Sequence, residues 1–268
     1  MDHRGPMAAR HAANMQLRFA AFGLFLLLAI WLAAVEMFSP PRYLLPSPLA
    51  VLQALLRQNS FLAHHTLVTL GEIFAGLLFG SVFGITVAFL VMALPRTGRL
   101  VWPMILVLQT FPVFVLAPLL VLWLGFGMAS KVAMTTIVIF FPVASSFADG
   151  LRRTETVLLE AAALTKATPW QVLVRLRVPL ALPALVSGLR VAVPLAPLGA
   201  VIGEWVGASA GLGFVMVQAN ARMQTDTVFA AMAILALTSV SLRLIFDRLT
   251  RGHPHWAAET DPNTLFSS

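Results

Sequence analysis

Long apolar runs separated by short polar stretches form the main pattern of this 268-residue sequence. About 20 apolar residues are enough for an α-helix to cross the hydrocarbon core of a bilayer. Six runs of about this length predict spanning helices, at residues 19–38, 66–94, 102–126, 131–149, 179–203 and 227–246. Two shorter stretches, residues 49–58 and 212–222, predict helices at the membrane surface. The pattern therefore predicts an all-α polytopic membrane protein with six transmembrane helices.

The spans divide the chain into one membrane domain and two polar ends. We expect residues 1–18 to form a cytoplasmic N-terminal segment, 19–249 a transmembrane domain and 250–268 a cytoplasmic tail. A cleaved signal peptide is the alternative for the first run, although that run is long for one and many spans follow it. The second span contains glycines at spacings of four and five that predict close helix packing: Gly71, Gly76, Gly80 and Gly84.

The longest polar break covers residues 150–183 and holds five of the eighteen Lys and Arg residues. A polar stretch of this length cannot lie in hydrocarbon, so it must project into water between two spans. Residues 156–164 favour a helix, and Thr168, Pro169 and Gln171 form a capping-box pattern that begins a second one. We therefore predict two short helices that meet at a turn.

Composition agrees with a membrane protein and narrows its chemistry. Hydrophobic residues make up 59% of the chain, charged residues 11%, and the mean hydropathy is +0.87, whereas about a quarter of the residues in soluble domains are charged. The chain has no cysteine, which excludes disulfides and thiolate metal sites. The net charge of +7 comes from basic residues spread singly at span ends without aromatic platforms, so we expect no nucleic-acid partner.

The basic residues also predict the orientation of the chain. Thirteen of the eighteen lie at the N-terminus, in the 96–99 turn, in the segment 150–183 or at the C-terminal end. Bacterial membranes retain positive charge on their cytoplasmic side. We therefore expect a bacterial inner-membrane protein with both termini and the segment 150–183 in the cytoplasm.

Ionisable residues inside spans cost about 3 kcal/mol each on insertion scales, so they usually face a partner or a water-filled path. Glu72 and Glu204 lie toward the outer ends of their spans. They either border the mouth of a path or are simply hydrated at the interface. Arg190 lies deeper, where it pairs with a carboxylate, contacts a polar solute, or snorkels or binds helix-end carbonyls.

Gln109 and Thr110 precede Pro112, which frees a carbonyl one turn back, and this break either lines a cavity or is a packing kink. His64 and His65 predict a hydrated interface pair, because no third metal ligand is near them in the sequence. The chain has no GxxxxGK[ST] phosphate loop and no catalytic motif. We therefore expect no ATP site, metal, cofactor or enzymatic activity in this chain.

Glu160-Ala161-Ala162, the Ala-rich turn after them, and the prolines before the next span resemble the EAA loop of ABC-importer permeases. In that family the loop forms coupling helices that dock in a cleft of a separate ATPase subunit. The resemblance implies a coupling role for seven residues: Glu160, Ala161, Ala162, Lys166, Thr168, Pro169 and Trp170. Lys166 replaces the glycine that is usual at the turn. Because a side chain costs about 1 kcal/mol in a left-handed backbone, we expect this turn to be built differently. An ordinary amphipathic loop between spans is the alternative.

A second run, from Pro118 to Lys131, resembles the APLxxxWFGxGxxSK pattern of the sulfonate-type permeases. The two motifs together imply a type I ABC-importer permease with the MetI-like fold. The implied partners are two ATPase copies, a second permease copy in a homodimer, a periplasmic or lipid-anchored solute-binding protein, and the lipid bilayer.

The stretches 203–214 and 218–224 look most like permeases for thiamine pyrimidine precursors, hydroxymethyl- or formylamino-pyrimidine, with riboflavin permeases next. Permeases for sulfonate, taurine or nitrate are the sister alternative. An ion-coupled secondary transporter and a membrane enzyme are alternatives from other classes, but the chain shows no convincing internal symmetry and no clustered polar site. The residues that we expect along the translocation path are Glu72, Gln109, Thr110, Arg190, Glu204 and Asn220.

Overall fold

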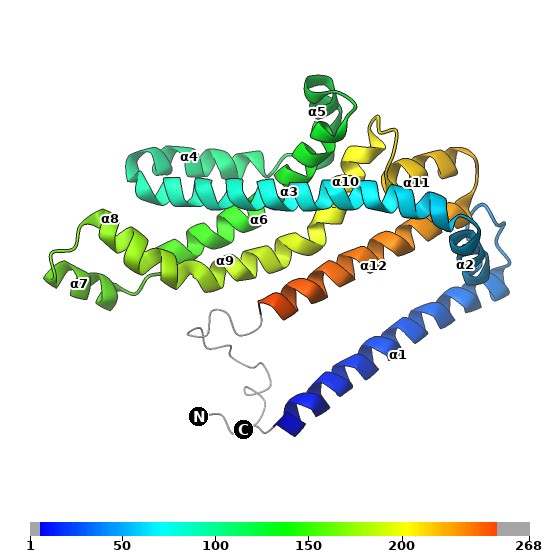
Figure 1. The fold of residues 1–268 in the computed structure, drawn as a ribbon, viewed down its shortest axis with the longest axis horizontal. Coiled ribbons are helices and arrows are strands. Elements are labelled where there is room, and N and C mark those ends of the chain that lie inside the picture. The colour runs from blue at the N-terminus through cyan, green and yellow to red at the C-terminus, as the bar shows by residue number, and fades with distance from the viewer. Residues whose placement is uncertain (1–5, 251–268) are drawn as a thin grey trace. The chain divides into compact units, whose positions relative to one another are not determined.

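Figure 1 shows the fold in a computed structural model, which describes residues 6–250. Within this range the chain is helical and contains no β-strand, so the all-α prediction is confirmed. The helices are α1 (Pro6–Phe38), α2 (Pro48–Arg57), α3 (Asn59–Ala93), α4 (Pro95–Leu108), α5 (Leu116–Leu124), α6 (Met128–Arg152), α7 (Thr156–Leu164), α8 (Pro169–Val172), α9 (Val178–Ala192), α10 (Ala196–Trp205), α11 (Leu212–Ala221) and α12 (Thr225–Leu249).

The chain divides into two compact units. One consists of the residues up to Leu62 together with Met216–Met232, and the other of Ala63–Val215 together with the residues from Ala233 onward. In the first unit the indole N–H of Trp31 donates to Pro46 O at 3.0 Å, and the amide of Gln58 donates to Thr227 Oγ1 at 3.0 Å. The residues of the candidate site described below lie mostly in the second unit.

Four helical stretches of the described chain are long and apolar enough to cross a membrane: Asn59–Ala93, Met128–Arg152, Pro169–Trp205 and Thr225–Leu249. They correspond to four of the six predicted spans. The described apolar part of α1, Phe22–Phe38, is shorter than these. The part of the N-terminal segment before residue 6 and the tail after residue 250 lie outside the described residues. The count of six spans therefore stays a prediction.

The predicted third span, 102–126, is not one straight helix. α4 and the helical stretch Val113–Leu124 meet at 85°, so together they form a broken span or a re-entrant loop. The break falls at Pro112, which has an extended backbone, with φ −61° and ψ 111°. Proline has no N–H to continue the helical hydrogen-bond ladder, and its ring clashes with the preceding turn. The proline therefore produces a sharp corner in place of the single interrupted span that we predicted.

The predicted fifth span, 179–203, is longer than expected. Helical structure runs without a gap over Pro169–Trp205, 37 residues, through a π-helical turn at Leu173–Arg177. Pro179 has no N–H to donate to the helical hydrogen bonds. The π-helical turn just before it is a local irregularity of the kind found where an α-helix is disturbed. The second short helix that we predicted in the polar segment is therefore the first turn of this long helix.

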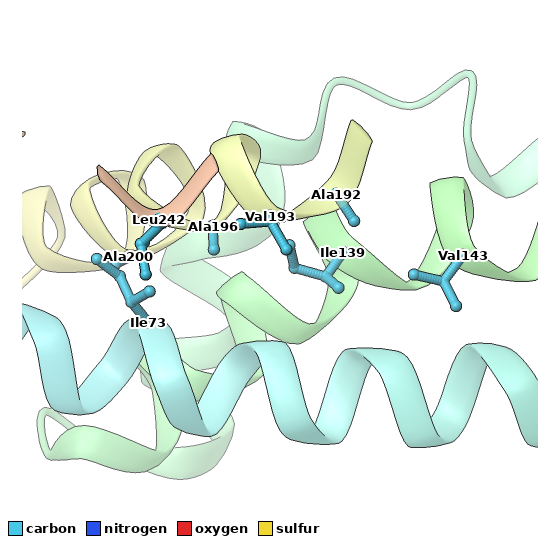
Figure 2. Close-up of a cluster of buried hydrophobic side chains, with 8 residues drawn as sticks. All are labelled: Ile73, Ile139, Val143, Ala192, Val193, Ala196, Ala200 and Leu242. Carbon is cyan, nitrogen blue, oxygen red and sulfur yellow. The ribbon is translucent and has the colours of Figure 1, made fainter. Parts of the chain in front are cut away.

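α6 forms the centre of the second unit, because neighbouring helices pack on it through small residues. A Cβ atom added at Gly80 of α3 would lie 2.7 Å from Ile139 Cβ, and one added at Gly199 of α10 would lie 2.8 Å from Thr135 Cα. Figure 2 shows the buried cluster around this contact, with side chains from α3, α6, the α9–α10 stretch and α12: Ile73, Ile139, Val143, Ala192, Val193, Ala196, Ala200 and Leu242. The predicted glycine packing of the second span is confirmed for Gly76, Gly80 and Gly84, whereas Gly71 meets only the end of the Met128 side chain.

Candidate functional site

The turn after α7 is closed by a residue in the left-handed conformation. Lys166 has φ +54°. Its N–H donates to Ala163 O at 3.0 Å, and the N–H of Ala167 donates to Ala162 O at 3.2 Å, which is the hydrogen-bond pattern of a Schellman motif. The expectation of a differently built turn is therefore wrong. The two hydrogen bonds hold Lys166 in the conformation that glycine adopts at no steric cost.

The predicted capping box begins the next helix. Thr168 Oγ1 accepts a hydrogen bond from the N–H of Gln171 at 3.3 Å, and Gln171 Oε1 accepts one from the N–H of Thr168 at 2.9 Å. Pro169 takes the first helical position, where a missing N–H has no cost. The segment between α7 and α8 is thus fixed at both of its ends.

The segment presents a mixed polar and apolar surface. Glu160 and Ala161 are exposed, and Ala162 is half-buried. Leu164 is 88% exposed. The Trp170 ring is 59% exposed and also packs edge-on against Phe89 of α3, with ring centroids 5.7 Å apart. The contact between Trp170 and Phe89 therefore holds this surface against the spans, while Glu160, Ala161 and Leu164 remain exposed to a partner.

A second feature of the site is a buried polar cluster where α3, α6 and α10 meet. Glu72 and Glu204 are 3% and 1% exposed, and Lys131 is 1% exposed. The carboxyl groups of Glu72 and Glu204 lie close to each other. Thr69 Oγ1 donates to Glu204 Oε1 at 2.6 Å. Both glutamates are therefore buried where these helices pack, and their role along a translocation path stays a prediction.

The cluster also holds the start of α11. The N–H of Gly213 donates to Glu204 Oε2, the N–H of Leu212 donates to Thr69 Oγ1 at 2.8 Å, and the N–H of Gly211 donates to His65 Nδ1 at 3.0 Å. These are backbone donors that the first turn of a helix leaves without intrahelical partners. Gly211 has φ +109°, and the Glu204 carboxyl group fills the space in which a Cβ would lie.

Lys131 ties two loops together from the same buried position. Its Nζ donates to Phe126 O at 2.7 Å, to Ser130 Oγ at 3.3 Å and to Gly207 O at 3.4 Å. The lysine also lies close to the two glutamates. A cavity of about 430 Å³ adjoins the cluster, and Glu72, Lys131, His64 and Ser209 are among its lining residues. Oε2 of Glu72 has no hydrogen-bond partner among the described residues.

Arg190 pairs with a carboxylate, which was one of its three predicted interpretations. Its Nε lies 2.9 Å from Asp247 Oδ1 of α12. Arg243 donates to Asp247 Oδ2 at 2.8 Å and to the backbone carbonyl of Arg190 at 2.6 Å. The three residues join α9 to α12. A role for Arg190 along a solute path stays a prediction.

Residues 80–253 match the family described as the binding-protein-dependent transport system inner membrane component. The chain belongs to this family. It is a permease subunit of an ABC importer and a multi-pass membrane protein. Its resemblance to the EAA-loop permeases is thereby confirmed.

Named relatives agree with this assignment. A probable ABC transporter permease protein of Haemophilus influenzae is 48% identical over 82% of this permease and 89% of its own length. The formylaminopyrimidine transport permease protein of Halalkalibacterium halodurans is 39% identical over 80% of this permease and 86% of its own length. The riboflavin transport system permease protein of Chloroflexus aurantiacus is 33% identical over 88% of each chain.

A solved structure supports the fold. A chain of the inward-facing MetNI methionine ABC transporter superposes on the permease with a TM-score of 0.64, covering 73% of the permease and 97% of that chain. At 22% sequence identity this likeness is one of fold alone. The predicted type I importer fold is confirmed.

The other predicted path residues of the permease do not join the buried cluster through any contact that we observe in the described residues. Gln109 and Thr110 are exposed at the corner between α4 and α5, where Thr110 Oγ1 donates to Val107 O at 2.7 Å. Asn220 is exposed near the end of α11 and belongs to the first unit. Their roles in the permease stay predictions.

Three residues of the cluster were missed or misread in the sequence. The sequence gives Thr69 no predicted role, His65 is 6% exposed and not part of a hydrated pair, and Lys131 is buried although it begins a predicted span. A signal was present for two of them. His65, Thr69 and Glu72 follow one another at spacings of four and three, which places them on one face of α3 in the permease.

Proposed function

We propose that this permease forms a translocation path together with a second copy of itself, and that a separate ATPase drives it through the segment 150–183. The observation that carries this proposal is the braced turn between α7 and α8. A Schellman motif ends one helix and a capping box begins the next. Such a segment keeps its shape without a partner, which suits a docking surface that must transmit force.

The long helix Pro169–Trp205 supports the coupling role. It carries Trp170 at one end and Glu204 at the other. At about 1.5 Å per residue it is on the order of 55 Å long, which exceeds the roughly 30 Å of a hydrocarbon core. This stretch is continuous helical chain, although a π-helical turn at Leu173–Arg177 and a 3-10 turn at Val193–Leu195 interrupt the α-helix. It joins the proposed docking surface to the buried cluster, so movement of the segment would shift the packing around Glu204.

We place the segment 150–183 and both termini in the cytoplasm, because most of the basic residues then lie on that side. Two ATPase copies would bind the two segments of a permease homodimer, and a solute-binding protein would deliver the solute to the opposite face. ATP hydrolysis would then take place in a different chain.

The coupling role is tested by Glu160→Lys, measured as uptake and as ATPase activity of the assembled transporter. We expect the variant to enter the membrane normally and to lose ATP-coupled uptake, because it reverses a charge on the exposed face of α7. Glu155→Lys, an exposed glutamate just before α7, is the matched control and should retain uptake. Full transport by the Glu160 variant would refute the proposal, and uptake that survives ATP depletion but needs a proton gradient would indicate a secondary transporter.

For the solute, we propose a thiamine pyrimidine precursor of the hydroxymethyl- or formylamino-pyrimidine type. The formylaminopyrimidine permease supports this choice, since its 39% identity exceeds the 33% of the riboflavin permease. The cavity beside Glu72 also suits an aminopyrimidine, because a carboxyl group can hydrogen-bond to an amino group and a ring nitrogen together.

The solute is tested with the binding protein that works with this permease. That protein should copurify with, or bind, an aminopyrimidine, and excess aminopyrimidine should compete for uptake. If the binding protein held riboflavin, a sulfonate, taurine or nitrate, that compound would be the solute of this importer. The proposal that the chain is an ABC-importer permease would be unaffected.

A further inference from the structure

A second cavity, of about 450 Å³, lies at the end of the spans next to the segment 150–183. It is separate from the polar cluster around Glu204. Three arginines from different elements line it: Arg99 from the first turns of α4, Arg152 from the last residue of α6 and Arg177 from the π-helical turn. Val91 and Trp102 belong to its apolar wall.

Packing fixes the shape of this cavity. α4 approaches α3 so closely that a Cβ at Gly98 would collide with Val91 O. The guanidinium carbon of Arg152 lies 4.6 Å from the centroid of the Trp102 ring, which orients that arginine by a cation–π contact. Arg177 Nη1 lies 3.3 Å from Met92 Sδ, an interaction that leaves its positive charge uncompensated.

Positive charge exceeds negative charge at this place. Among the described residues, the carboxylate found near the three guanidinium groups is that of Asp149, 4.0 Å from Arg152 and itself 54% exposed. α4 begins here without a side-chain cap and without an acidic residue in its first turn. The positive end of its helix dipole therefore adds to the field of the arginines.

We propose that this cavity binds a phosphate group, carried either by an anionic phospholipid or by a soluble phosphorylated solute. The planar guanidinium fork matches phosphate oxygens in a bidentate way, and three such groups converge here. The apolar wall formed by Val91, Met92, Trp102 and Pro103 suits the glycerol and first acyl carbons of a lipid. Basic pockets between the ends of membrane helices are suited to lipid headgroups. The proposal rests on this geometry and does not depend on the solute of the importer.

The test uses the full permease in phosphatidylcholine nanodiscs, with and without phosphatidylglycerol, and native mass spectrometry to measure retained lipid. The pocket variant is Arg99→Gln with Arg177→Gln. The control is Arg96→Gln with Arg153→Gln, which removes the same charge from two exposed arginines that do not line the cavity. Near a membrane surface each basic residue contributes about fivefold to the binding of anionic lipid. We therefore expect binding to weaken about 25-fold in the pocket variant, and clearly less in the control, because Arg96 and Arg153 do not line the cavity and cannot both contact one headgroup held in it.

A parallel arm adds glycerol phosphate to the permease in pure phosphatidylcholine. Retention of phosphatidylglycerol alone assigns the phosphate to a lipid, and binding of glycerol phosphate alone assigns it to a soluble solute. The proposal would be overturned if phosphatidylglycerol binding weakened equally in the pocket and control variants. It would also be overturned if the permease retained neither phosphatidylglycerol nor glycerol phosphate in preference to phosphatidylcholine. Arg99→Gln alone is the second variant, because Arg99 is exposed and its loss leaves the contacts of Arg152 and Arg177 intact.

Discussion

Single residues of this permease carry backbone conformations and charges that their neighbours in space make possible. Lys166 adopts a left-handed backbone because two hydrogen bonds enclose it, and Gly211 leaves room for a carboxyl group where any side chain would collide. Lys131 is buried with three oxygen acceptors around its Nζ and two carboxyl groups close by. In each case the residue is explained by a few contacts within hydrogen-bond distance.

At this scale we predict that Lys166→Gly strengthens the turn of the coupling segment. Glycine removes a conformational cost of about 1 kcal/mol at φ +54°. Amide hydrogen exchange at Ala167, whose N–H closes the Schellman motif, should slow about fivefold. Thr165→Gly is the matched control, because Thr165 has φ −83° and a glycine there should leave exchange unchanged or faster. Slower exchange in both variants would contradict the explanation.

Elements of the permease are shaped by prolines and by stripes of small residues. Pro112 turns the predicted third span through 85°, whereas the π-helical turn before Pro179 lets the long helix continue. Both sites contain a proline, but only the first breaks the helix. Whether a helix continues past a proline depends on whether the neighbouring turns can change their hydrogen-bond pattern to make up for the missing N–H.

The small-residue stripe of α3 gives the prediction at this scale. Gly80→Ala should lower the stability of the purified permease by about 1–3 kcal/mol, because the added Cβ would lie 2.7 Å from Ile139 Cβ in a packed contact with α6. Gly71→Ala in the same helix is the control. Its added Cβ would lie 3.4 Å from the flexible end of Met128. Thermal unfolding in detergent measures both, and equal melting temperatures for the two variants would disprove the packing argument.

The molecule as a whole joins a preformed surface segment to a buried polar cluster through the continuous helical stretch Pro169–Trp205. Coupling through such a helix requires that its two ends face opposite sides of the membrane. The pairing of Arg190 with Asp247 further ties this helix to α12. The proposed mechanism therefore depends on the orientation of the chain.

The orientation gives the prediction at this scale, and the cysteine-free sequence provides a clean background for it. Lys166→Cys in the turn and Ser209→Cys beside the cavity are both at exposed positions of the second unit. A membrane-impermeant maleimide added outside intact cells should label the cysteine at 209 and leave the one at 166 unlabelled until the cells are opened. The reverse pattern would place the segment 150–183 outside the cell and exclude coupling to a cytoplasmic ATPase.

The sequence alone determined the class of the protein, the positions of the spans in α3, α6 and α12 to within several residues, and the capped start at Thr168. Apolar run length and helix caps are local properties, so neighbouring residues are sufficient to reveal them. Only the tertiary structure decided that Glu204 meets Glu72 and Lys131, and that Arg190 meets Asp247. These partners lie more than 50 residues apart in the chain. Their contacts depend on how the helices pack, and neither composition nor spacing specifies that packing.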